Sequence, residues 1–225
     1  MLVKDLLHTE FNALSSEVSR NKVLEQMEDH GLNIYPVIDQ ITGKYIGLIT
    51  KKMMLERTRQ MEDETELLTE ISLYPVKAYP TQHLFEVAGI FLRNELRILP
   101  IVDIDNNFIG VIYKNEVFKT ILNMLNLTEL GSVLNIEVDQ KDYVLSDIIR
   151  IIEMEGAKVL GVAIEAPSDT FSRIKISIKL NMTEIMAVSS SLKRHGFVIT
   201  SESHDSSQSR EYEERADEFL RYLEI

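Results

Sequence analysis

The sequence predicts a mixed α/β (α+β) protein with two copies of a strand–helix–strand–strand–helix unit, then a βαββαβ unit and a C-terminal helix. Two repeated segments predict the first part. IYPVID at 34–39 returns as ILPIVD at 98–103, and YIGLIT at 45–50 returns as FIGVIY at 108–113. The βαββαβ unit is predicted by the strand and helix patterns that follow Gly131.

The two copies keep a nearly constant spacing. Pro36 and Pro100 are 64 residues apart, whereas Gly47 and Gly110 are 63 apart. The difference of one residue falls in the turn between the paired strands, where surface loops tolerate deletions. Short runs rich in Val and Ile, bounded by turn residues, predict buried strands. The chain therefore carries an internal duplication.

Helical patterns flank each predicted strand pair. The helix before the first pair ends near Gly31, because glycine commonly terminates helices. Before the second pair, Thr81 is the expected N-cap of a helix. Two more helices are expected near Lys52–Gln60 and Lys114–Leu125, after the glycine-bearing strands.

The pattern after Gly131 predicts strands at 133–138, 159–165, 173–180 and 197–200, with helices at 143–155 and from Thr183 to Gly196. This order is the split βαβ, ferredoxin-like arrangement. Residues 202–209 are a polar linker before a helix at 210–225. The apolar face of that helix either packs on its own chain or crosses a dimer as a swapped arm.

Composition narrows the function classes. A length of 225 residues allows one or two domains, and a net charge of −12 opposes binding to nucleic acid. The absence of cysteine excludes disulfides and thiolate chemistry. No apolar stretch is long enough for a membrane helix, and no secretory signal is visible. We therefore expect a cytoplasmic protein without nucleic-acid or membrane partners.

Catalytic and metal-binding motifs are missing from the sequence. It contains no phosphate loop, no dinucleotide fingerprint and no nucleophile elbow. Its five histidines lack metal-ligand spacing and are expected at surface or capping positions. The segment 103–107 imitates a calcium loop, but Phe108 and Lys114 replace the required glycine and glutamate. We expect a hairpin turn there, and no enzyme activity, metal or required cofactor.

The duplicated pattern of an apolar pair, Pro, Val/Ile, Asp, hairpin, Gly and helix resembles the cystathionine-β-synthase (CBS) domain, which occurs in tandem pairs called Bateman modules. The C-terminal part resembles an ACT domain, and similar chains are acetoin-utilisation-type CBS proteins. The expected organisation is CBS repeats at 1–60 and 71–127, a connecting segment at 61–70, an ACT-like domain at 131–201, a linker at 202–209 and a helix at 210–225.

The resemblance implies a regulatory sensor that binds an adenosyl ligand, such as AMP, ATP or S-adenosylmethionine, in clefts between the repeats. It also implies a homodimer. The family marker is Thr or Ser followed three residues later by Asp, where the acid binds ribose and the hydroxyl faces phosphate. Thr50 matches but Met53 replaces the acid; in the second copy Tyr113 replaces the hydroxyl and Glu116 the acid. The candidate ligand-binding residues are Tyr35, Leu48, Ile49, Thr50, Lys51, Met53, Leu99, Val111, Ile112, Tyr113, Lys114 and Glu116.

Two alternatives stay open. Lys51, Lys52 and Lys114 lie at helix starts, where they oppose the helix dipole unless a phosphate is near, or they are ordinary exposed lysines. The protein is either a sensor for an unidentified regulated partner or a homodimeric interaction scaffold that binds no small ligand. The turn at 139–143 lacks the Pro and Gly of amino-acid-binding ACT domains, which favours a structural or dimerising role.

Overall fold

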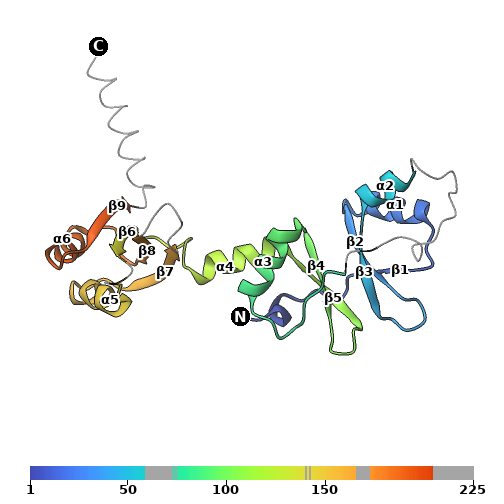
Figure 1. The fold of residues 1–225 in the computed structure, drawn as a ribbon, viewed down its shortest axis with the longest axis horizontal. Helices are drawn as coiled ribbons and strands as arrows, with labels where there is room; N and C mark the ends of the chain where they lie inside the picture. Colours follow the sequence, from blue (N-terminus) through green and yellow to red (C-terminus); the bar gives the residue numbers. More distant parts are fainter. Residues whose placement is uncertain (59–72, 74, 140, 142, 166–172, 205–225) are drawn as a thin grey trace, which may run out of the picture. The chain divides into compact units, whose positions relative to one another are not determined.

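The computed structural model describes residues 1–58, 73, 75–139, 141, 143–165 and 173–204. The chain divides into two compact units, Met1–Ile121 and Leu122–Ile225 (Figure 1). Both mix helices and strands, which confirms the predicted α/β fold class. The predicted connecting segment at 61–70 and the predicted C-terminal helix at 210–225 lie outside the described residues. The predicted linker at 202–209 is wrong at its start, because residues 202–204 belong to a strand that pairs across the sheet; its remainder lies outside the described residues.

The first unit contains two similar runs of elements, and the last helix extends into the second unit. In chain order these elements are η1 (Val3–Leu6), β1 (Leu14–Ser15), α1 (Arg20–Asp29), β2 (Ile34–Ile38), β3 (Tyr45–Thr50), α2 (Lys51–Thr58), α3 (Leu84–Asn94), β4 (Ile98–Val102), β5 (Phe108–Tyr113) and α4 (Lys114–Met124).

The hairpins β2–β3 and β4–β5 share one register. Val37 lies opposite Gly47, and Ile101 lies opposite Gly110, with a bulge directly after both pairs. The strand β1 pairs in parallel with β2, and Ala78 makes the equivalent single bridge to Ile101. The duplication seen in the sequence is therefore a duplication of strand geometry.

The tips of the two hairpins meet with approximate twofold symmetry. The amide of Tyr45 donates to the carbonyl of Asn106 at 2.9 Å, and the amide of Phe108 donates to the carbonyl of Gly43 at 3.4 Å. Each donor and each acceptor is 63 residues from its counterpart, so the two bonds are reciprocal. Gly43 and Asn106 both adopt left-handed backbone with φ near +69° and +68°, a conformation that glycine and asparagine tolerate best.

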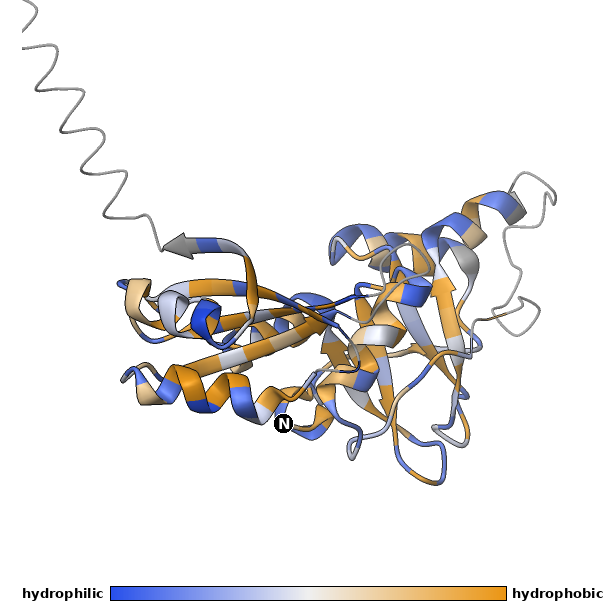
Figure 2. Cartoon of the chain, turned by 60° about the vertical axis from the view of Figure 1, so that its left-hand side comes forward, coloured by the Kyte–Doolittle hydropathy of each residue, from blue (hydrophilic) through white to orange (hydrophobic). Residues whose placement is uncertain are grey.

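The strands supply much of the hydrophobic cores. They are mostly orange in Figure 2, the colour of hydrophobic residues, whereas the helices mix orange and blue residues. One core joins the repeats, because Ile34, Tyr45 and Leu48 pack with the buried residues of the second repeat. The hydroxyl of Tyr45 donates to the carbonyl of Val76 at 2.7 Å, and burial raises the pKa of this phenol. A smaller core fills the first repeat alone.

The N-terminal segment packs on the second repeat. His8 exchanges two backbone hydrogen bonds with Val111 of β5, at 2.9 and 3.1 Å. Gly110 makes this approach possible, because a Cβ atom there would lie 2.3 Å from the carbonyl oxygen of His8. The segment thus extends the hairpin of the second repeat.

The second unit has the predicted βαββαβ order. After α4 come β6 (Ser132–Asp139), α5 (Leu145–Met154), β7 (Val159–Glu165), β8 (Arg173–Leu180), α6 (Met186–Arg194) and β9 (Val198–His204). The antiparallel sheet has the order β7–β8–β6–β9, so β8 lies between β6 and β7, as a split βαβ requires. Both helices bury apolar residues against one core with the sheet.

Two predicted helix starts are wrong. The helix α3 begins at Leu84, and its N-cap is His83, whose Nδ1 accepts from the amide of Phe85 at 3.2 Å. Thr81 lies earlier because residues 79–82 first form a turn, closed by the Gln82 amide on the Tyr79 carbonyl. Likewise, α6 begins at Met186 with Ile185 as N-cap, and Thr183 lies before it.

No helix among the described residues combines the length and the apolar character needed to cross a membrane.

Candidate functional site

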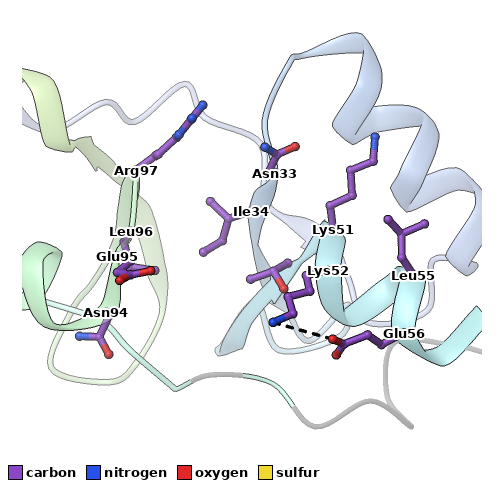
Figure 3. A pocket seen from close by; sticks show the side chains of 11 residues that line it. Asn33, Ile34, Lys51, Lys52, Leu55, Glu56, Asn94, Glu95, Leu96 and Arg97 are labelled. Atoms are coloured by element: carbon purple, nitrogen blue, oxygen red, sulfur yellow. Dashed lines mark ion pairs between the residues drawn. The ribbon is translucent and has the colours of Figure 1, made fainter.

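A cleft lies where the two repeats meet, and we call it the first cleft. Its volume is about 690 Å³, and it opens beside the start of α2 and the connection from α3 to β4 (Figure 3). The lining residues are Asn33, Ile34, Thr50, Lys51, Lys52, Leu55 and Glu56 from the first repeat, and Asn94, Glu95, Leu96 and Arg97 from the second. An overlapping cavity of about 460 Å³ adds Met53, Val76 and Arg93.

The start of α2 presents polar groups to the first cleft. The Thr50 hydroxyl accepts from the amide of Met53 at 3.2 Å, so Thr50 caps the helix. The amide of Lys51 donates to the Asn33 carbonyl at 2.8 Å. Among the described residues, no hydrogen-bond acceptor is recorded for the amide of Lys52, one of the first-turn donors that a helix cannot satisfy itself. An anion at this position would complete the helix start.

Three cations line the first cleft, two of them already paired. Lys51 Nζ lies 3.0 Å from Glu28, and Lys52 Nζ lies 3.8 Å from Glu56. These carboxylates offset the lysines without a phosphate, although exposed pairs are worth only about 0–1 kcal/mol and yield readily to a competing anion. In the described part of the chain, no ion pair is recorded for the exposed Arg97. Figure 3 shows Arg97 and Lys51 on opposite sides of the cleft, both pointing toward the top of the view, while Lys52 turns to Glu56.

Glu95 brings backbone strain and negative charge into the first cleft. Its φ of +53° is left-handed, a conformation that is unfavourable for residues with a Cβ atom. The equivalent residue of the first repeat is Gly31, with φ +63°. A strained residue at a cleft is held there by its surroundings, and this carboxylate partly offsets the positive side of the cleft.

A second cleft is built from the equivalent elements. One cavity of about 550 Å³ is lined by Leu32, Arg97, Ile98, Tyr113, Lys114 and Asn115. The amide of Lys114 donates to the Arg97 carbonyl at 2.9 Å, which repeats the bond between Lys51 and Asn33. Lys114 Nζ lies 5.8 Å from the centre of the Phe118 ring, so the ring itself faces this cation.

A further cavity of about 530 Å³, which we call the aromatic cavity, adjoins the second cleft, because Leu32 and Tyr113 line both. Glu116 contacts one of the lining residues, because its carboxylate lies 2.7 Å from Nε2 of His8. Tyr35 lines this cavity as well, and its hydroxyl is hydrogen-bonded to Nδ1 of His30. The pKa of Tyr35 is raised by burial first, and then by Tyr113 and Asp29.

The candidate residues of the sequence analysis thus fall into three groups. Thr50, Lys51 and Met53 lie at the first cleft, and Tyr35, Tyr113 and Lys114 at the second cleft and the aromatic cavity. Glu116 contacts His8 beside them. The expected apolar walls have no exposed surface and belong to the core; they are Leu48, Ile49, Leu99, Val111 and Ile112.

Sequence reasoning missed the residues between each helix end and the next strand. Asn33, Glu95 and Arg97 line the first cleft, but none belongs to the family marker. A signal was present, because Asn33 and Arg97 are 64 residues apart, like the two prolines. Extending the repeat spacing backwards from the strands would have found them.

Comparison with known proteins identifies the family to which the first unit of the chain is similar. Residues 3–59 and 68–123, about half of the chain, match the CBS domain. The chain therefore belongs to the CBS-domain family, as a tandem pair.

Two curated relatives share 26% identity with this chain. One is the CBS domain-containing protein YhcV of Bacillus subtilis, over 59% of this chain and 91% of that protein. The other is the A-adding tRNA nucleotidyltransferase of Aquifex aeolicus, over 53% of this chain. The match spans only 14% of the Aquifex enzyme. Its nucleotidyltransferase activity is therefore not transferred to this chain.

Solved structures resemble a little more than half of the chain. A CBS domain pair/ACT domain protein of Thermotoga maritima is 18% identical, with TM-score 0.49, over 56% of this chain and 99% of its own. An acetoin utilization protein (AcuB) of Vibrio cholerae is 19% identical, with TM-score 0.49, over 57% and 95%. CBSX2, solved in complex with AMP, is 20% identical, with TM-score 0.46, over 54% and 96%.

Proposed function

We propose that the protein is a non-enzymatic regulator whose CBS pair binds an adenine nucleotide, AMP or ATP, in the first cleft. The start of α2 carries the proposal, because Thr50, the amide of Lys52 and Arg97 all lie at one cavity of about 690 Å³. That volume falls within the roughly 300–1,000 Å³ of small-molecule sites. A helix start flanked by cations suits phosphate.

The first cleft has Met53 at the position where the family marker has an acidic residue. Met53 supplies no carboxylate for ribose hydroxyls, so recognition rests on the phosphate and on the side-chain amides of Asn33 and Asn94, which line the cleft. S-adenosylmethionine, which has no phosphate, is the weaker candidate of the three adenosyl ligands. Binding would regulate a partner only by favouring one of two arrangements of the protein.

Calorimetric titration of the full chain with AMP, ATP and S-adenosylmethionine tests the proposal. We expect saturable heat below about 1 mM for AMP or ATP. Arg97→Glu should weaken the affinity by about tenfold or more, because a charge-assisted bond is replaced by repulsion. Lys158→Glu, an equal charge change in the second unit, is the matched control and should leave affinity unchanged. No heat at millimolar nucleotide would favour the scaffold alternative instead.

The homodimer, the cytoplasmic location and the dimerising role of the C-terminal unit remain predictions. The sheet order of that unit is compatible with an ACT-like domain. Light scattering of the purified chain at several concentrations tests the dimer directly.

A further inference from the structure

The aromatic cavity differs in chemistry from the first cleft. Five of its lining residues carry rings: His8, Phe11, His30, Tyr35 and Tyr113. Glu10 supplies a carboxylate to the lining, and no Lys or Arg occurs among the described residues that line it. A phosphate would therefore meet no lysine or arginine among these lining residues, and one carboxylate.

The rings are inclined to one another. His8 and Tyr113 meet edge to face, with centroids 4.9 Å apart and planes 82° apart. Phe11 and Tyr35 have centroids 5.5 Å apart and planes inclined by 41°. In an edge-to-face contact the edge of one ring covers a face of the other, so each pair still leaves ring faces that its partner does not cover.

Several of these rings are fixed before any ligand binds. His8 is held through its backbone by Val111 and through Nε2 by Glu116. Tyr35 is only 3% exposed, and its hydroxyl is bonded to His30. Little side-chain freedom is left to lose, and such preorganisation favours affinity.

The electrostatic surroundings disfavour added negative charge. Burial raises the pKa of Tyr35, and Tyr113 and Asp29 act in the same direction. Glu10 and Glu116 bring two further carboxylates to the lining and to His8. A positive charge enclosed by ring faces gains both from the ring quadrupoles and from these acids.

From this convergence of ring faces and carboxylates, we propose that the aromatic cavity binds a small organic cation of the quaternary-ammonium type. The site is separate in chemistry from the nucleotide site, and binding there requires no nucleotide. The protein would thus respond to two kinds of small molecule, one anionic and one cationic.

Calorimetry with choline and its neutral isostere 3,3-dimethylbutan-1-ol tests the charge preference. The two probes have nearly the same shape, so their difference isolates the charge. We expect saturable binding of choline and at least tenfold weaker binding of the alcohol. Equal affinities, or no choline binding up to about 50 mM, would overturn the proposal.

Variants test the location. Phe11→Leu and Tyr113→Leu each remove one ring and should weaken choline binding by about tenfold, whereas Tyr113→Phe keeps the ring and should change it less than about twofold. Glu10→Gln should weaken binding by about threefold. Thermal melting checks that each variant folds; if Tyr113→Leu does not, Phe11→Leu still decides. Unchanged choline affinity in folded Phe11→Leu contradicts the assignment.

Nucleotide titrations separate this proposal from the proposed function. Loss of AMP binding in Phe11→Leu, with choline binding unchanged, would mean that the cavity holds adenine, and the cation proposal would fail. Loss of AMP binding only in Arg97→Glu, with choline affinity unaffected, supports both sites.

Discussion

The two repeats of the first unit share the backbone geometry of their hairpins but differ in the side chains that line the clefts. The hairpins share register, bulge and left-handed turn position. Around the clefts, the equivalent residues are Gly31 and Glu95, Asn33 and Arg97, Thr50 and Tyr113, and Met53 and Glu116. Every one of these pairs changes charge, size or backbone freedom.

The difference shows how one duplicated frame holds two unlike sites. Strand pairing depends on the backbone and on burial, so it survives many substitutions. A cleft depends on side chains at helix starts, where Thr50 caps a helix and Tyr113 instead contacts His8. The first cleft is therefore basic, while the cavity beside the second is aromatic and acidic.

The largest effect on stability is expected at Gly110 of the second repeat, whose counterpart in the first repeat is Gly47. A methyl group there would meet the His8 carbonyl, so Gly110→Ala should lower the free energy of unfolding by about 2–3 kcal/mol. Urea unfolding measures the change, and faster hydrogen exchange at the amides of His8 and Val111 should accompany it.

Gly89→Ala is the matched control for this change. Gly89 lies within α3, and its added methyl group would meet only the flexible end of Arg93. Since alanine favours helix, this variant should be neutral or up to about 1 kcal/mol more stable. An equal loss of stability in both variants would contradict the special role of the approach between His8 and Gly110.

A smaller effect on stability is expected when Glu95, at the end of α3, is replaced by the glycine found at the equivalent position of the first repeat. Glu95→Gly removes the left-handed strain and should raise the free energy of unfolding by roughly 0.5–1 kcal/mol, after the entropy cost of glycine. It also removes a carboxylate from the first cleft, so AMP should bind about two- to threefold more tightly. Lower stability, measured by thermal melting, would show that Glu95 makes a compensating contact.

The smallest effect concerns the hairpin turns. The side-chain amide of Asn107, followed by backbone amides, lowers the pKa of Asp103. Because the folded pKa is depressed, this contribution to stability is present above the unfolded pKa, near 4, and is lost as pH falls through the folded value. Asn107→Ala should raise the pKa of Asp103 while leaving that of Asp39 in the first hairpin unchanged. Carboxyl NMR titration compares the two directly.

Much of the fold was predictable because its strands carry strong signals. The spacing of Pro36 and Pro100, with Val- and Ile-rich runs, predicted both hairpins, and β7 and β8 have the predicted bounds. The start of α3 was missed because a turn and the imidazole of His83 replace the expected threonine cap. The carbonyls of Pro80 and Gln82 in this turn accept from the amides of Lys4 and Val3, a long-range contact that helix propensity does not detect.

The cleft was harder to predict than the fold. Leu48 and Val111 are apolar strand residues near the marker, so sequence alone could place them on a cleft wall or in the core; both are fully buried. Arg97 was overlooked because its role depends on the packing of two repeats, which no local pattern records. His8 reaches Glu116 across more than a hundred residues of sequence, and only the fold brings them together.

Amide NMR of the full chain during an AMP titration would locate the nucleotide site residue by residue. We expect the largest chemical-shift changes at residues 50–53 and 94–97, with smaller ones around the aromatic cavity. Shifts confined to the second unit, or no shifts at millimolar AMP, would contradict a nucleotide site at the start of α2.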